Sequence, residues 1–149
     1  MWVGVLSKTQ GELHSELFNL FDGMDFIIHC GSIGGERILE ELSNVAPTSG
    51  VLGVGDSHED YPFEEVLVRE MGGVSVMITQ DINDPSNPDD RLNGLLAQHT
   101  PKVILFGNGD DSYTATIDDR FWFNPGPAHL GAGIVEIDGS SIRGQLVTF

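Results

Sequence analysis

Apolar residues in the first third of the chain alternate between short continuous runs and helical spacing. We expect strands over residues 2–6, 25–30 and 51–54, because each is a short apolar run suited to a buried strand. Between them, leucine, isoleucine and phenylalanine recur at helical spacing over 12–21 and 34–43, which predicts two amphipathic helices. Strands that alternate with helices indicate a parallel sheet built from β-α-β units.

The pattern changes after residue 60. Two runs flank Met71-Gly72-Gly73 and predict a β-hairpin over 65–70 and 74–79, and an acidic, proline-bearing loop follows over 81–90. A short helix is expected over 91–99. Further strands are expected over 103–106, 113–117, 120–123, 133–137 and 141–148. We therefore predict one α/β domain over residues 1–149, with two sheets packed face to face and helices outside.

The charge of the chain excludes some kinds of partner. The 149 residues hold 7 Lys+Arg against 23 Asp+Glu, a formal net charge of −16. Nucleic acids and anionic membrane surfaces are both held by clustered basic residues, so we expect neither as a partner. No apolar run approaches the ~20 residues of a membrane span, and the single cysteine excludes an internal disulfide. These features predict a cytoplasmic protein.

Polar side chains follow each expected strand of the α/β part and several strands after it. In a mostly parallel sheet, active residues collect in the loops beyond the carboxyl ends of the strands. The loops read Ser7-Lys8-Thr9-Gln10-Gly11, His29-Cys30-Gly31-Ser32, Gly55-Asp56-Ser57-His58, Thr79-Gln80-Asp81, Gly107-Asn108-Gly109-Asp110 and Asn124-Pro125-Gly126-Pro127.

In this order the loops resemble those of the calcineurin-like metallophosphoesterases, most closely their small bacterial and archaeal phosphodiesterase branch. The loops of that family read Ser-Asp-x-His-Gly, His-x-Gly-Asp, Gly-Asn, a lone His, Gly-His-x-His and Asn-Pro-Gly-Ser. The resemblance covers nearly the whole chain and implies a four-layer α-β-β-α sandwich with two mixed sheets. It also implies Asp, His and Asn side chains that hold two divalent metals, which activate a water and clamp a phosphate.

The residues of these motifs that do not bind metal are largely present, but the metal ligands are not. The seven degenerate positions are Lys8 and Ser32 for Asp, Asp56 for Asn, and Gln10, Gln80, Asn108 and Asp110 for His. Neutral Gln and Ser are poor ligands, and the Lys8 ammonium would repel a dication by several kcal/mol at an effective dielectric of about 20. We therefore expect no catalytic residue and no cofactor, and a protein that binds a small ligand or a protein partner in the cleft.

Two other functions stay open. A weak or altered phosphodiesterase could use one divalent metal (Mn, Ni, Mg or Zn) at Asp56 and Asp110, with His58 or Asn108. Metal-free chemistry would need a nucleophile and a base, and the serines of these loops have no histidine partner except His29. The exposed edges of two sheets also make a homodimer plausible.

The acidic residues of these loops lead to a further hypothesis. Without two dications, Asp56, Asp81 and Asp110 would repel each other in a partly buried cleft, and Lys8 supplies one positive charge. We expect Lys8 to form an ion pair with Asp56 or Asp110. His29 is expected to be a strand-end histidine bonded to backbone, and the residue after it, Cys30, a buried and inert thiol.

Overall fold

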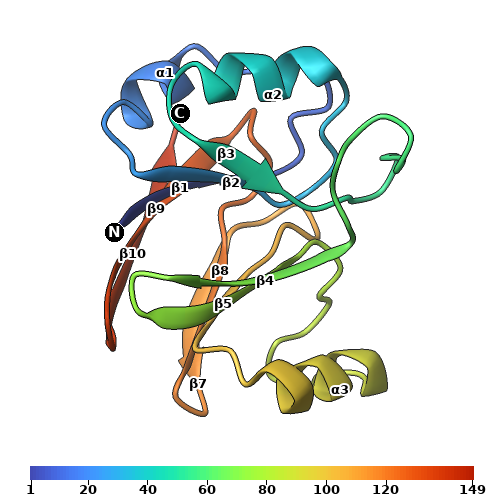
Figure 1. The fold of residues 1–149 in the computed structure, drawn as a ribbon, viewed down its shortest axis with the longest axis vertical. Coiled ribbons are helices and arrows are strands. Elements are labelled where there is room, and N and C mark those ends of the chain that lie inside the picture. The colour runs from blue at the N-terminus through green and yellow to red at the C-terminus, as the bar shows by residue number, and fades with distance from the viewer.

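The first sheet contains the predicted β-α-β units (Figure 1). The computed structural model describes residues 1–149. The strands are β1 (Trp2–Leu6), β2 (Phe26–His29), β3 (Thr48–Gly50), β9 (Gly131–Asp138) and β10 (Ser141–Thr148), and the helices that link the first three are α1 (Glu16–Leu20) and α2 (Glu36–Ser43). β1, β2 and β3 pair in parallel, β9 pairs antiparallel with β1, and β10 pairs antiparallel with β9. The strand order is β10-β9-β1-β2-β3.

The second sheet is built from the middle of the chain. Its elements are β4 (Val66–Met71), β5 (Val74–Thr79), α3 (Asp90–His99), β6 (Val103–Leu105), β7 (Tyr113–Ile117) and β8 (Arg120–Asn124). The order is β4-β5-β6-β8-β7, with a parallel centre of β5, β6 and β8 and an antiparallel strand at each edge. Both sheets are therefore mixed, as predicted.

Three apolar clusters hold the layers together. The central cluster joins the inner faces of the two sheets and includes Val5, Ile28 and Leu105. A second cluster lies between the first sheet and the helices α1 and α2, and a third lies between the second sheet and α3. Figure 1 shows the resulting order of layers, with α1 and α2 at one end and α3 at the other. The four-layer α-β-β-α sandwich is confirmed. None of the helices is both long and apolar enough to cross a membrane.

The first helix begins later than predicted, at Glu16 instead of residue 12. The ring of His14 stacks on Phe149 with 4.5 Å between the ring centroids, and its Nδ1 accepts the backbone N–H of Glu16 at 3.2 Å. This side-chain bond removes a donor that a longer helix would use, so the segment before residue 16 turns instead of continuing the helix.

The third strand lies upstream of its predicted position. The run at 51–54 was expected to be a strand because it is apolar, yet β3 ends at Gly50. Val51 and Leu52 are buried, but the N–H of Leu52 donates to the carbonyl of Glu64, outside the sheet. Apolar character therefore predicted the burial of Val51 and Leu52 correctly and the strand boundary wrongly.

Candidate functional site

The loops that follow β1, β2, β6 and β8 touch one another at the carboxyl ends of the parallel strands. The N–H of Lys8 donates to the carbonyl of Gly31 at 2.9 Å, and the Ser7 hydroxyl donates to the carbonyl of Gly107 at 3.2 Å. The N–H of Ala128 donates to the carbonyl of Ser7 at 2.8 Å. The fold thus brings the sequence-predicted loops together at one end of the sandwich.

Three of the candidate residues hold a backbone conformation that favours glycine. Lys8, Gln10 and Ser32 have φ of 52°, 49° and 58°. For an ordinary L-residue this left-handed region costs roughly 1–2 kcal/mol, and only Asn and Asp visit it with some ease. Such strain gathers at functional sites in proteins. The loop shape is therefore held by the surrounding contacts, because these three side chains do not favour it.

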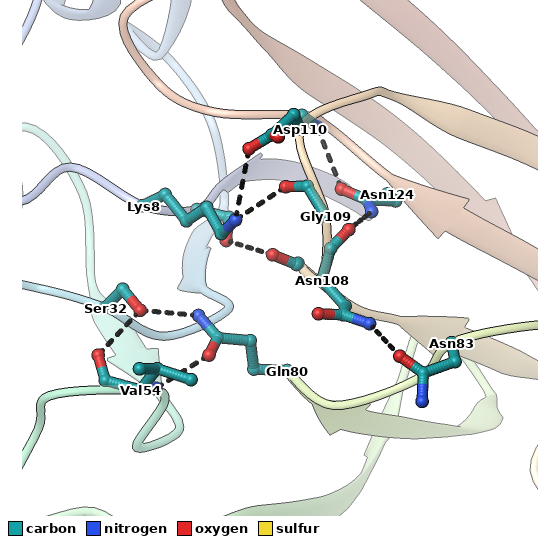
Figure 2. Close-up of polar contacts among 12 residues, drawn as sticks. Lys8, Ser32, Val54, Gln80, Asn83, Asn108, Gly109, Asp110 and Asn124 are labelled. Carbon is teal, nitrogen blue, oxygen red and sulfur yellow. Dashed lines mark hydrogen bonds and ion pairs between the residues drawn. The ribbon is translucent and has the colours of Figure 1, made fainter.

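Ser32, Val54 and Gln80 form a closed ring of hydrogen bonds (Figure 2). The Gln80 amide donates to Ser32 Oγ at 2.8 Å, and the Ser32 hydroxyl donates to the carbonyl of Val54 at 2.9 Å. The Val54 N–H closes the ring by donating to Gln80 Oε1 at 2.7 Å. Gln80 is 4% exposed and Ser32 7% exposed. These hydrogen bonds connect the second, third and fourth loops directly.

Asp56 is tied to backbone rather than to another side chain. Its Oδ2 accepts the N–H of Ser32 and the N–H of Gly53, each at 2.8 Å, and its Oδ1 accepts the N–H of Ile33 at 3.0 Å. Both carboxylate oxygens therefore join the second loop to the third. Charge-assisted bonds of this kind are among the stronger hydrogen bonds in proteins.

Lys8 pairs with Asp110, one of the two partners expected from the sequence, and not with Asp56. Its Nζ lies 3.8 Å from Asp110 Oδ1 and donates to the carbonyl of Gly109 at 2.6 Å (Figure 2). The Asp110 side chain is 98% exposed and that of Lys8 only 21%. An ion pair with so exposed a carboxylate contributes little, so the bond to the Gly109 carbonyl fixes the ammonium.

Asn108 forms hydrogen bonds to neighbouring loops, whereas the Gln10 side chain forms none. Asn108 Nδ2 donates to Asn83 Oδ1 at 2.7 Å and to the carbonyl of Ile82 at 3.1 Å, which ties the fifth loop to the acidic 81–90 loop. The Asn108 carbonyl accepts Asn124 Nδ2 at 2.7 Å, from the sixth loop. Gln10 is exposed and makes no side-chain hydrogen bond.

His29 is fully buried at the end of β2 and takes part in a chain of hydrogen bonds. Its Nδ1 accepts the N–H of Gly31 at 3.1 Å, so the ring proton is on Nε2, which lies 3.0 Å from Thr9 Oγ1 and donates to it. The Thr9 hydroxyl donates to the carbonyl of Ile33 at 2.6 Å. Burial lowers the pKa of His29 to about 3 and raises that of the buried Cys30 thiol. The backbone bond of His29 and the burial of Cys30 are as predicted, and His29 does not contact a serine.

Two shallow hollows flank this network of loops. One of about 300 Å³ is lined by Leu52, Gly53, Val54, Glu65, Thr79, Gln80, Asp81 and Arg91. The other, of about 410 Å³, is lined by Lys8, Thr9, Gln10, Glu12, Leu13, His14 and His129. We call these two hollows together the cleft.

Sequence reasoning missed three residues of the site: Thr9, Val54 and Asn83. Thr9 links the first two loops, and Asn83 anchors the fifth. Val54 was expected within a strand, yet its backbone belongs to the hydrogen-bonded ring and the residue is 84% exposed. The two glycines that flank Val54 were the only signal in the sequence that this position could leave the sheet.

Comparison with solved structures identifies proteins of the same fold. The fold is similar to that of Vps29 from Chaetomium thermophilum, with a TM-score of 0.81 and 14% identity over 95% of this chain and 84% of that one. It is also similar to an archaeal phosphodiesterase, with a TM-score of 0.74 and 17% identity over 99% of this chain and 100% of that one.

The sequence relationship agrees with the fold. The chain is 22% identical over 158 residues to a probable metallophosphoesterase of Methanothermobacter thermautotrophicus, which covers 99% of this chain and 92% of that protein. Residues 1–136 match the calcineurin-like phosphoesterase superfamily domain. The chain therefore belongs to the calcineurin-like phosphoesterase superfamily.

Proposed function

We propose that this protein is a non-catalytic relative of the phosphodiesterases that binds a partner protein or a small ligand in the cleft. It would lack two-metal hydrolysis because the seven degenerate positions do not form a metal cage. The observation that carries the proposal is the bond from Lys8 Nζ to the Gly109 carbonyl, at a position where the family has a carboxylate.

The donor set does not fit two divalent metals. Lys8 offers an ammonium, which is positively charged and repels a dication. The Gln80 amide and the Ser32 hydroxyl are neutral groups that already bond to each other. Three of the four acceptor sites of the Asp56 carboxylate are taken by backbone N–H groups, which leaves one site, on Oδ1, for a metal. We therefore derive no hydrolytic step through a metal.

The exposed side chain of Val54 supports binding as the function. The hydrogen-bonded ring fixes the backbone of Val54 while its isopropyl group is exposed beside the first hollow. A fixed apolar group beside polar walls is a usual feature of a recognition surface, where burial of the apolar group supplies affinity and the polar groups supply orientation.

The test restores the ligands of the family and asks whether metal binding follows. A sevenfold variant carries Lys8→Asp, Gln10→His, Ser32→Asp, Asp56→Asn, Gln80→His, Asn108→His and Asp110→His. Manganese, nickel and zinc are titrated calorimetrically, and an activated phosphodiester is the substrate. We expect the native protein to show neither stoichiometric metal binding nor turnover, and the sevenfold variant to bind metal.

The matched control is a sixfold variant that keeps Lys8. We expect it to bind metal more weakly than the sevenfold variant, because the ammonium stays in the cage. Stoichiometric metal binding together with turnover in the native protein would contradict the proposal. If the exposed Asp110 is then replaced in Asp110→Asn and that turnover is lost, the one-metal phosphodiesterase would be favoured. A folded sevenfold variant that binds no metal would contradict the assignment of the seven positions.

A further inference from the structure

The strand β7 is the least protected of the four sheet edges. The strand orders leave β10, β3, β4 and β7 at the edges. Proteins usually protect such edges with charged residues, proline or glycine, or with very short strands. β3 has three residues, β4 contains Arg69 and Glu70, and β10 contains Arg143 and Gly144. β7 reads Tyr-Thr-Ala-Thr-Ile, has none of these features and is mostly exposed.

The register of β7 shows which of its backbone groups face outward. Asp118 and Asp119 form a two-residue turn with φ of 51° and 65°, and Ile117 lies opposite Arg120 across it. In such a hairpin the pair next to the turn is hydrogen-bonded, and bonded pairs then alternate along the strands. The N–H and C=O groups of Thr114 and Thr116 therefore point away from β8. They have no other hydrogen-bond partner.

Aspartates lie at both ends of this edge. Asp110 and Asp111 precede β7, and the turn residues Asp118 and Asp119 follow it. Asp110 pairs with Lys8, and Asp119 pairs with Lys102 at 2.9 Å. Asp111 and Asp118 are exposed and have no ion-pair partner. One uncompensated negative charge is therefore present at each end of an open, uncharged strand.

This charge distribution opposes pairing with a second copy of the chain. Two copies that pair antiparallel through β7 would place the aspartates before one strand opposite those after the other. Like charges that face each other across strands are destabilising, and each copy also has a net charge of −16. The favoured occupant is a different chain with the opposite charge pattern.

The amino end of β7 also borders a small hollow that contains two exposed leucines. Asp110, Asp111 and Ser112 line a hollow of about 160 Å³ together with Leu130 and Leu146. These leucines are 53% and 36% exposed. A segment that extends past Asp111 would reach this hollow and could bury an apolar side chain there.

We propose that the β7 edge binds an extended segment of another protein, which adds a strand to the second sheet. Backbone bonds to Thr114 and Thr116 supply affinity. Basic residues about seven positions apart pair with Asp111 and Asp118, because seven positions of an extended strand span at most about 23 Å. This inference is independent of the function proposed for the cleft.

The experiment uses the whole protein and a synthetic peptide, Leu-Lys-Ser-Thr-Val-Thr-Ile-Ser-Lys-Leu, with blocked ends. A second peptide has Glu in place of both Lys residues. Binding is measured by fluorescence anisotropy up to about 1 mM protein, and amide hydrogen exchange is followed by NMR. We expect binding of the Lys peptide only, weakening as salt rises, with slower exchange at Thr114 and Thr116.

Two variants test the mechanism. Thr114→Pro removes one outward N–H, a change that an edge strand accepts, and we expect it to lower affinity by about tenfold. Its control, Thr114→Val, keeps the N–H and should bind within about twofold of the native protein. The double variant Asp111→Asn/Asp118→Asn should sharply reduce the preference for the Lys peptide, although the remaining net negative charge still favours it.

Several results would overturn the proposal. They are an absence of Lys-peptide binding, equal binding of both peptides, native affinity in a folded Thr114→Pro variant, or slower exchange at β10 instead of β7. If amide exchange at Thr114 and Thr116 slows as the protein concentration rises in the absence of peptide, the occupant is a second copy of the chain. That result would also overturn the proposal.

Discussion

At the scale of single residues, the candidate site consists of side chains that bond to the backbone of neighbouring loops. Gln80 joins three loops through the ring, Asp56 joins two through backbone N–H groups, and Lys8 joins the first loop to the fifth. The protein's own hydrogen bonds thus hold together loops that, in the family pattern, converge on metals. The buried His29 is part of the same network and has a measurable consequence.

His29 should make the folded protein less stable as the pH falls below 6.5. Its pKa is about 3 in the folded protein against 6.5 for the unfolded chain, so between these values only the unfolded chain binds the proton. The stabilisation is complete above pH 6.5 and is lost as the pH falls toward 3. From pH 7 to pH 5 this group should lower the free energy of unfolding by about 2 kcal/mol, measured by urea titration.

The variant His29→Gln should remove this part of the pH dependence. Carboxylates titrate over an overlapping range, so the informative quantity is the difference between the native protein and the variant at each pH. The control is His129→Gln, at an exposed position, which should keep the native pH dependence. A His29→Gln curve parallel to the native one between pH 7 and pH 5 would contradict the buried neutral state.

At the scale of elements, the sequence predicted what local pattern determines and missed what distant contacts determine. Periodicity placed both sheets and all three helices, because each element buries one face. It misplaced the start of α1 because His14 contacts Phe149, at the other end of the chain. It also missed the exposed loop at Val54, whose conformation depends on Gln80, 26 positions away. The order of the motifs identified the loops of the site, but the hydrogen bonds between these loops could not be predicted from the sequence.

The close approach of the first two loops depends on Gly34. A Cβ there would lie 2.2 Å from the backbone N of Gly11 and 2.4 Å from the carbonyl carbon of Gln10, at a φ of +85°. Gly34→Ala should therefore separate the loops and lower the free energy of unfolding by about 3 kcal/mol, from overpacking and backbone strain together. Urea unfolding measures the loss.

The neighbouring glycine is the matched control for this prediction. Gly35 also has a positive φ, +159°, but nothing lies within 4 Å of the Cβ that alanine would add there. Gly35→Ala therefore meets backbone strain without a steric clash, and should cost about 1–2 kcal/mol, less than Gly34→Ala. Equal losses in the two variants would show that the close approach of the loops is not what restricts position 34.

At the scale of the whole molecule, charge affects both stability and association. The net charge of −16, with His neutral, lies on a chain with only four ion pairs of Lys or Arg, and most of these are exposed. Exposed pairs contribute little to stability, whereas the summed repulsion of the acidic groups opposes the compact state. The same repulsion acts between copies of the chain, and the negative charge that causes it should favour binding of basic partners.

Added salt should therefore stabilise the fold while it weakens the binding of basic peptides. From about 0.01 M to about 1 M NaCl the Debye length falls from about 30 Å to about 3 Å, which screens repulsion between the acidic groups. We expect the Tm to rise by at least about 3 °C, on the order of 1 kcal/mol. Asp111→Asn/Asp118→Asn removes two of the unpaired charges and should show a smaller rise. A Tm that is flat or falls with NaCl, compared with an equal osmolarity of glycerol, would mean that the ion pairs outweigh the repulsion.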